Sequence, residues 1–399
     1  MSKLPIFFYR YLGSRFLSSV VYNTFMIFFL WELVVKFKSV FLAGLIPTIS
    51  LAAELFAAIP VGHLIDRFNS TKLSMLSSAL MLAGISVLIA GQRILFVYTA
   101  TIFVSVGLSM KGDTISATIK KNLDQDRFTS ANQWLQAASY ASGLIGTLFG
   151  GLSILYFRHG FLSVILALSL AAFIISFPIR EGTSGAGRTK AFSEIASSLV
   201  FIKKISGFLV LGFALNGLII SLDVYSSGLF HLILKVSAIY YTLFVAFLSI
   251  GGIIGAVISG KLKGYINTAN RVSMLVLLFS PAILVIALYR SATADIVDSF
   301  LLGILLPVIN IPLQVNLMKV IPRNIYGKVT AFLKVFLGGA TPGMAAVFSF
   351  LALFLRVDII LLYIGIIIFP VSALAFLVLP KFFAMAGDAS SGFQEAGEI

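Results

Sequence analysis

The sequence predicts an all-α membrane protein whose twelve transmembrane helices form two pseudo-symmetric six-helix bundles. Three observations predict this fold class. The chain of 399 residues is 59% apolar and only 11% charged. Its apolar residues fall in repeated runs of about 20, the length that spans a bilayer as a helix, and its basic residues concentrate in alternate loops. No soluble fold buries that much apolar surface, and without Cys the chain forms neither disulfides nor thiolate metal sites.

The apolar runs, read with their breaks, predict six spans in each half of the chain. In the first half these are residues 12–35, 40–62, 73–91, 94–118, 131–156 and 161–178. In the second half they are residues 207–230, 238–260, 272–289, 296–318, 328–355 and 359–380. Backbone polar groups cannot stay unpaired in hydrocarbon, and the runs lack the alternation of barrel strands. Each run is therefore expected to be helical.

The chain is expected to have four parts. Residues 1–178 form the first bundle and residues 207–380 the second. Between them, residues 179–206 begin with a Gly/Ser-rich stretch typical of a flexible linker and end with helical spacing of apolar residues, which predicts an amphipathic helix on the inner membrane surface. Residues 381–399 are polar and are predicted to form a disordered cytoplasmic tail.

The distribution of Lys and Arg predicts the orientation. About 20 of them fall in segments on the side of the N-terminus, and seven fall in the loops of the other side: Lys36, Lys38, Arg93, Arg158, Lys235, Arg290 and Arg356. The positive-inside rule then places both termini in the cytoplasm of a multi-pass plasma-membrane protein. Topology explains the net charge of +14 better than nucleic-acid binding does. The first apolar run is too long for a cleavable signal peptide.

Residues 60–76, PVGHLIDRFNSTKLSML, predict a short polar loop between the second and third spans. Gly62 would permit a tight turn there, because it carries no Cβ. Asp66 is unusual in a cytoplasmic loop, and the positive end of a neighbouring helix would stabilise it by about 0.3–1 kcal/mol. The loop is therefore expected to act as a latch, with Arg67 and Lys72 as its basic residues.

This stretch resembles the signature G-x-L-x-D-R-x-G-R-K between the second and third helices of the major facilitator superfamily of transporters. Gly62, Leu64, Asp66, Arg67 and Lys72 match in kind, Asn69 stands where the second Gly is usual, and Ser70–Thr71 lack the usual basic residue. The resemblance implies two parallel six-helix halves with a substrate path between them. Short matches between the halves, such as GHLI at residue 62 and GKLK at residue 260, favour an internal repeat.

A second resemblance lies in the predicted fifth span, in SGLIGTLFGG. The exporters of the superfamily often carry G-x-x-x-G-P-x-x-G-G there, and this chain has Thr147 at the Pro position. Close helix packing is the simpler interpretation, because small residues at four-residue spacing let helices approach. Together with the loops before each fifth span, the motif resembles the drug and siderophore exporter branch. Its glycines are Gly143, Gly146, Gly150 and Gly151.

Ionisable residues at membrane depth each need a partner or a task, because burying one costs at least about 2.5–3.5 kcal/mol. Glu54 lies in the second span, and Lys111 and Asp113 lie in the fourth, roughly 10–14 Å above Lys120 at about 1.5 Å per residue. Lys111 and Asp113 are two residues apart on a helix and must face different ways. Lys111 would either pair with an acid or hold an anionic substrate.

In the superfamily the first, fourth, seventh and tenth spans line the cavity. The resemblance therefore implies a substrate cavity with these candidates: Tyr22, Asn23, Lys111, Asn216, Asn310 and Gln314. Four acids are candidates for proton coupling, and the first two are the better placed: Glu54, Asp113, Asp223 and Glu32. For Glu32 and Asp223, and for Asp298, the alternative is that they reach the headgroups at the outer ends of their spans or pair structurally.

The sequence thus predicts a secondary transporter that works by alternating access and exports a small organic molecule in exchange for protons. It is expected to act as a monomer in lipid, without cofactor, metal or nucleic acid. The three His residues have neither metal-ligand nor triad spacing and no phosphate-cradling motif occurs, so an enzyme is not expected. Two alternatives remain open: an importer or facilitator of a small anion held by Lys111, and a non-transporting membrane scaffold.

Overall fold

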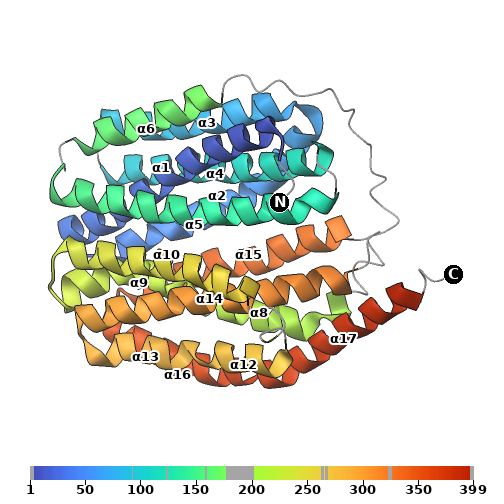
Figure 1. Cartoon of the computed structure of the whole chain (residues 1–399). Helices are drawn as coiled ribbons and strands as arrows, with labels where there is room; N and C mark the ends of the chain where they lie inside the picture. Colours follow the sequence, from blue (N-terminus) through green and yellow to red (C-terminus); the bar gives the residue numbers. More distant parts are fainter. Residues whose placement is uncertain are drawn as a thin grey trace. The chain divides into compact units, whose positions relative to one another are not determined.

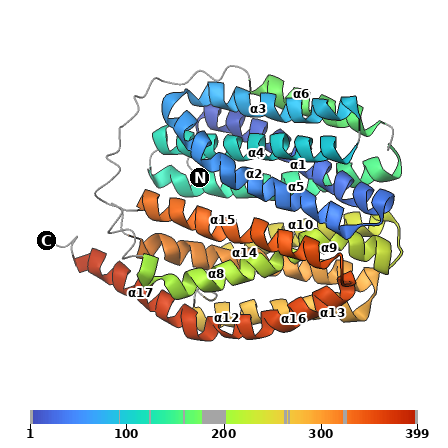
Figure 2. The same cartoon turned by 180° about the vertical axis from the view of Figure 1, so that it is seen from behind.

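The computed structural model describes residues 4–91, 93–122, 125–157, 160–176, 202–261, 265, 268–321 and 326–395. All regular elements within these ranges are helices. The chain divides into two compact units (Figures 1 and 2). Unit 1 comprises Met1–Arg188, Phe230–Leu232 and Val236–Ala246, and unit 2 comprises the remaining residues. The all-α prediction is confirmed.

Unit 1 is a bundle organised around its first helix. Its helices are α1 (Ile6–Phe37), α2 (Val40–Arg67), α3 (Ser70–Val87) with the 3₁₀ turn η1 (Leu88–Ala90), α4 (Ile94–Asn122), α5 (Gln125–Leu155) and α6 (Phe161–Ile175). Helix α1 packs against α2, α4, α5 and α6. Its aromatic residues form the core, where Phe28 stacks on Phe161 of α6 with ring centroids 3.6 Å apart. Buried aromatic rings supply large apolar contact area, which fixes α1 inside the bundle.

Unit 2 is also helical, and several of its predicted spans are broken into two helices. Its elements are α8 (Ser206–Ile219), α9 (Ser221–Gly228), the π-helical η2 (Leu229–Ile233), α10 (Ala238–Lys261), α12 (Ala269–Leu277), α13 (Phe279–Tyr289), α14 (Ala292–Val320), α15 (Tyr326–Leu351), α16 (Val357–Ala373) and α17 (Ala375–Glu395). The residues Phe230–Leu232 of η2 and the first part of α10, up to Ala246, belong to unit 1. Tyr225 of α9 donates a 2.5 Å hydrogen bond to the carbonyl of Phe348 in α15.

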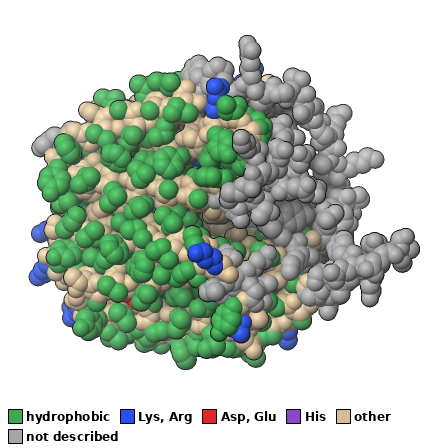
Figure 3. Space-filling view, viewed as in Figure 1, with side chains coloured by type: hydrophobic (Ala, Val, Ile, Leu, Met, Phe, Trp, Pro, Cys, Tyr) green, Lys and Arg blue, Asp and Glu red, His purple; other side chains and the backbone are tan. Residues whose placement is uncertain are grey.

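Nine helices of the described residues are long and apolar enough to cross a membrane, and a tenth results if α16 and α17, bent by 42°, count as one span. Two shorter apolar helices, Phe161–Ile175 and Phe336–Leu351, fall within further predicted spans. The count of twelve stays a prediction. Hydrophobic side chains cover most of the described surface in Figure 3, as expected for surface in contact with lipid.

The predicted loop at residues 60–76 is wrong in extent. Helix α2 continues to Arg67 and α3 begins at Ser70, so only two residues connect them. Phe68 has extended backbone angles and Asn69 occupies the N-cap of α3. Gly62 is therefore helical, with no atom within 4 Å of a Cβ built there. A helix can leave the hydrocarbon without ending, because its backbone remains hydrogen-bonded and its polar side chains meet water.

The predicted disordered tail is also wrong in part, because α17 continues from the membrane segment to Glu395. No Pro follows Pro380 in this stretch, so every residue after it keeps the backbone N–H that a helix needs. The predicted amphipathic helix of residues 179–206 lies almost wholly outside the described residues. Of this stretch the structure describes residues 202–206, of which 202–204 are helical and Ser206 begins α8. The predicted bundle boundaries remain predictions.

Within unit 2, α10 and α14 meet without room for side chains. A Cβ on Gly303 would lie 2.2 Å from the carbonyl oxygen of Leu248, and one on Gly251 would lie 2.2 Å from that of Phe300. Both clashing atoms are backbone atoms, which cannot move aside singly. The contact is therefore one of backbone against backbone, as at other small-residue crossings in membranes.

Gly303→Ala should lower the free energy of unfolding by about 1–3 kcal/mol, because overpacking forces two helix backbones apart. Gly338→Ala is the matched control: it is also helical, but nothing lies within 4 Å of its Cβ position, so Ala should be neutral or stabilising. Thermal unfolding of both purified variants in detergent compares them. Equal melting temperatures would contradict the close α10–α14 packing.

Candidate functional site

Lys111 lies at the centre of a fully buried polar cluster in unit 1. It is 0% exposed, and its ammonium nitrogen Nζ donates to Ser14 Oγ at 2.7 Å, to Ser176 Oγ at 3.0 Å and to Ser78 Oγ. Ser14 belongs to α1, Ser78 to α3 and Ser176 to the end of α6. We call these three hydroxyl groups the serine nest. It brings four helices of unit 1 together around one cation.

The serine nest satisfies an ammonium group without a carboxylate. Ser176 donates to the carbonyl oxygen of Ala172 at 2.7 Å, and Ser14 and Ser78 lie 2.7 and 2.8 Å from Ser176 Oγ. Ser78 also reaches the Ala172 oxygen, at 3.4 Å. One arrangement gives every hydrogen of the cluster an acceptor. In it, Lys111 donates to the three hydroxyl groups, Ser14 donates to Ser176, and both Ser78 and Ser176 donate to the carbonyl oxygen of Ala172. A buried charged group is costly unless each of its donors has a hydrogen-bond acceptor, and this cluster provides one for each.

Asp113 faces a different neighbour, as the two-residue offset from Lys111 predicts. The Arg15 guanidinium of α1 lies beside α4, because a Cβ on Gly112 would be 3.5 Å from its Nη1. The negative charge of Asp113 acts on Arg15, so the two groups form an electrostatic pair across the α1–α4 contact. Asp113 is half-buried, in contrast to Lys111. The interior of unit 1 thus holds two cationic groups and one acid within a short stretch of α1 and α4.

A third polar group in unit 1 links α1, α2 and α4. Tyr22 and Ser50 lie 3.0 Å apart through their oxygens, and Ser50 and Ser105 lie 2.7 Å apart. Glu54 follows Ser50 by one turn of α2 and shares its face, and it is half-buried. Tyr22 and Glu54 were among the predicted site residues, whereas Ser50 and Ser105 were not.

Two further candidates, Asn23 and Glu32, lie on α1 and are half-buried. The Asn23 amide donates to the carbonyl of Ser19 at 2.7 Å, on its own helix, and its side chain is half-buried. Glu32 is half-buried near the end of α1.

The candidates in unit 2 are exposed in the described structure. Asp223 of α9 is exposed although its neighbours Leu222 and Val224 are buried, and Asn216 of α8 is exposed too. Asn310 and Gln314 are both exposed and lie one turn apart on α14, so they share a face as predicted. Within the described part of the chain, no hydrogen bond joins these four polar residues to one another.

Asp298 does not fit the expectation that it reaches the headgroups. It is 8% exposed, and its Oδ2 has no hydrogen-bond partner among the described residues. Asp295 precedes the predicted span and was not a predicted site residue, yet it is 0% exposed. Helix α14 begins at Ala292, four residues earlier than expected, and so places both acids inside the unit.

The gating residues are placed only in part. The backbones of Gly62, Asp66 and Arg67 lie in the last two turns of α2, and Lys72 is exposed in the first turn of α3. The side chains of Asp66 and Arg67 lie outside the described part of the structure. The latch therefore stays a prediction.

Three of the four motif glycines of α5, Gly146, Gly150 and Gly151, lie close to other helices, as the simpler interpretation of the motif expects. A Cβ on Gly146 would lie 2.6 Å from Asn23 Cβ, and one on Gly150 would lie 2.9 Å from Ile27 Cβ, both on α1. Thr24 of α1 donates to the Gly146 carbonyl oxygen at 3.1 Å. Gly151 faces Thr242 of α10, and Gly143 is half-buried.

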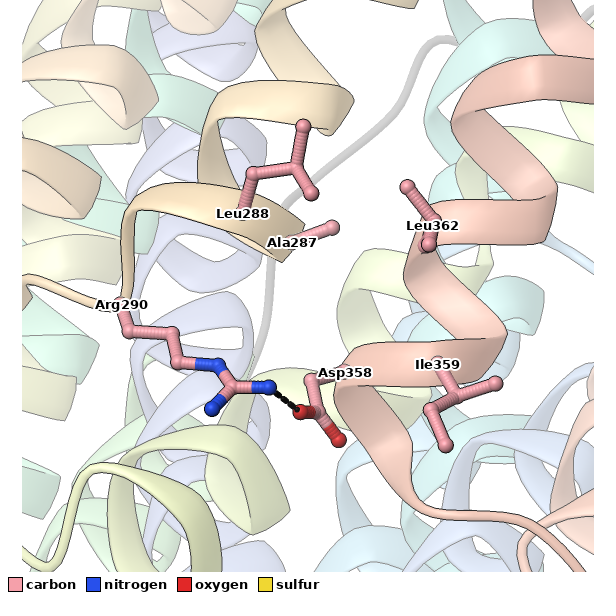
Figure 4. A pocket seen from close by; sticks show the side chains of 6 residues that line it. All are labelled: Ala287, Leu288, Arg290, Asp358, Ile359 and Leu362. Atoms are coloured by element: carbon pink, nitrogen blue, oxygen red, sulfur yellow. Dashed lines mark hydrogen bonds and ion pairs between the residues drawn. The ribbon is translucent and has the colours of Figure 1, made fainter.

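A pocket in unit 2 lies where the end of α13 meets the start of α16, and it has a volume of about 230 Å³ (Figure 4). Its walls are Ala287, Leu288, Arg290, Asp358, Ile359 and Leu362. Arg290 Nη2 lies 2.7 Å from Asp358 Oδ2, and Arg356 lies 3.1 Å from the same oxygen. Asp358 is 3% exposed whereas the arginines are 58% and 60% exposed. This arrangement is an ion-paired link between the two helices.

Bundles of long apolar helices with ionisable groups in their interiors define a polytopic membrane protein, the class to which secondary transporters belong. The family model of the Major Facilitator Superfamily matches residues 11–343. The chain belongs to the major facilitator superfamily, and it is a transporter rather than an enzyme.

Solved structures similar to this chain are transporters with different substrates. A mutant of the nucleoside transporter NupG is 12% identical with a TM-score of 0.71, covering 95% of this chain and 99% of that one. A peptide transporter POT in complex with sulfate is 14% identical with a TM-score of 0.72, covering 96% of both chains. A bacterial homologue of the human lysosomal transporter Spinster is 12% identical with a TM-score of 0.67, covering 96% and 95%. A comparison with curated proteins found no match. At these identities the likeness shows the fold alone.

Proposed function

We propose that the protein exports a small organic molecule by alternating access and that proton uptake drives the export. The observation that supports this most is the Arg15–Asp113 pair inside unit 1. An acid at membrane depth beside a cation can exchange its proton while the cation holds the site in either charge state. A scaffold has no use for such a pair, because apolar packing would replace it at no cost.

In this mechanism Asp113 is the first candidate for the proton carrier. Glu54 is the second, because the polar chain from Tyr22 through Ser50 to Ser105 lies on its side of α2. Asp223 and Glu32 remain candidates. The substrate would contact Tyr22, Asn23, Asn216, Asn310 and Gln314, and Lys111 would reach it only if the serine nest opens. The resemblance of the α5 glycines to the exporter motif supports export, and the distribution of Lys and Arg supports a plasma-membrane protein with both termini in the cytoplasm. The monomer is proposed as the working unit.

A substrate screen tests the transport function itself. Purified protein is mixed with nucleosides, peptides, sugars, drugs and metal chelates, and the melting temperature is measured for each. Binding stabilises the folded state by RT ln(1 + [L]/Kd), so a substrate at 100-fold its Kd adds about 2.7 kcal/mol. Hits are then tested for counterflow in proteoliposomes. A scaffold would give no ligand-dependent shift and no counterflow.

Asp66→Asn should slow transport while leaving the amount of folded protein unchanged. The expected cause is the loss of an anion that holds neighbouring helix ends together in the outward-facing state. Initial rates of counterflow measure the effect, and Lys72→Gln is the control within the same motif, with a smaller expected loss because Lys72 is exposed. Wild-type rates for Asp66→Asn would remove the latch from the mechanism.

A further inference from the structure

Two acids near the start of α14 are buried and have carboxylate oxygens without a hydrogen-bond partner among the residues that the structure describes. Asp295 is 0% exposed, and neither of its carboxylate oxygens has a hydrogen-bond partner among the described residues. Asp298 is 8% exposed, and its Oδ2 is likewise unpartnered within those residues. The two residues are three apart on one helix and therefore lie on the same face. The charge of Asp298 acts on Asp295, so the two carboxyl groups are neighbours.

Among the described residues, the elements that pack on α14 bring no cation to this end. Helix α13 ends at Tyr289, just before α14 begins, and has no charged residue between Phe279 and Tyr289. Arg271 of α12 and Lys381 of α17 lie near the opposite ends of their spans. The part of α10 from Phe247 onward has Lys261, at its far end, as its sole titratable residue. Arg290, which follows α13, pairs with Asp358.

Two bare carboxylates cannot persist side by side in such surroundings. An isolated buried charge costs several kcal/mol even after relaxation, and a like charge one turn away adds to that cost. The positive end of α14 returns only about 0.3–1 kcal/mol. The oxygens of the backbone offer no donor, and the described part of unit 2 offers no cation, which points to a bound cation as the source of the positive charge.

We propose that Asp295 and Asp298 form a binding site for one small cation, either a proton shared between the carboxyl groups or a sodium ion held by their oxygens. The inference rests on the proposed function in one respect: in a transporter whose proton carrier is Asp113, this site would bind a second cation. It is placed on the helix that carries Asn310 and Gln314, about 18 and 24 Å along the axis from Asp298 at about 1.5 Å per residue. Cation binding at one end of α14 and substrate contact farther along it would then act on one helix, on opposite sides of Pro307.

The test measures binding without transport. Infrared difference spectra of the purified protein, wild type minus Asp295→Asn/Asp298→Asn, are recorded at neutral pH in choline chloride and in sodium chloride. The difference isolates the C=O stretching band of a protonated carboxyl group at this site. Melting temperatures are measured in the same two salts. The double variant should fold at least as stably as the wild type, because it removes buried charge, and Asp358→Asn serves as the control for an acid that is ion-paired.

A carboxyl band that is present in both salts identifies the ligand as a proton. A band that sodium removes, or a sodium-dependent rise in melting temperature seen in the wild type but not in the double variant, identifies it as sodium. The absence of both signals overturns the proposal. Because neither readout requires a substrate, a protein that binds the cation but fails in proteoliposomes would refute the transport function and leave the cation site standing.

Discussion

Ser78→Ala/Ser176→Ala is expected to lower the free energy of unfolding by about 3–5 kcal/mol, the cost of removing the partners of a buried charge. The two hydroxyl groups accept two of the three hydrogen bonds of the Lys111 ammonium. Ser14 alone cannot satisfy the remaining donors. The loss would appear as a lower denaturant midpoint in SDS titrations and as a lower melting temperature.

Two controls separate this effect from a general loss of hydroxyl groups. Ser86→Ala also removes a hydroxyl from α3, but this hydroxyl donates to Leu82 on its own helix, so the expected change is small. Lys111→Met removes the charge and fills its volume, which is often neutral or stabilising for buried charges. In the Lys111→Met background, the two Ser substitutions should therefore lower the free energy of unfolding by much less than they do in the wild type. If the double Ser variant were as stable as Ser86→Ala, the serine nest would not be holding a charge.

Asp113→Asn is expected to abolish transport driven by a pH gradient while leaving counterflow in place. The amide keeps the shape of the acid but cannot carry a proton, and it leaves the charge of Arg15 without the negative charge of Asp113 at every step of the cycle. Substrate exchange needs no net proton movement and should continue. Glu54→Gln is the comparison, with a smaller expected loss because Asp113 has the charged partner.

Asp295→Asn alone should also be measured in this assay, since it reports on the second cation site. If both Asp113→Asn and Glu54→Gln retained uphill transport, the proton carrier would have to lie elsewhere. Loss of counterflow as well as uphill transport in Asp113→Asn would show instead that this residue shapes the substrate path.

The sequence was sufficient for the fold class, because hydropathy fixes which segments enter lipid and lipid permits only helices for them. The helical period led us to expect Lys111 and Asp113 on different sides of α4, and small residues at four-residue spacing led us to expect close packing in α5, where Gly146, Gly150 and Gly151 lie close to other helices. The prediction failed where polar segments were assigned to loops. Helix α2 continues through Gly62 to Arg67, and α17 continues through the polar tail to Glu395. Polar composition marks exposure to water, and a helix can be exposed.

The partners of the buried charges could not be predicted from one sequence. Ser14, Ser78 and Ser176 are far apart along the chain, and nothing in their spacing indicates that they meet at Lys111. Serine at mid-span is common and carries little signal on its own. Arg15 offers a stronger sequence signal, since it lies three residues after the start of the apolar run at residues 12–35 and is therefore close enough to lie within the span. Asp295 was missed because a charged residue at a span end is usually assigned to the loop.

The most direct measurement uses proteoliposomes with a pH-sensitive dye inside and a substrate from the thermal-shift screen outside. With no membrane potential, the account predicts that adding substrate moves protons across the membrane in the opposite direction, and that Asp113→Asn vesicles show substrate exchange without proton movement. Substrate flux that proceeds uphill with no proton movement, or that is the same with and without a pH gradient, would contradict it.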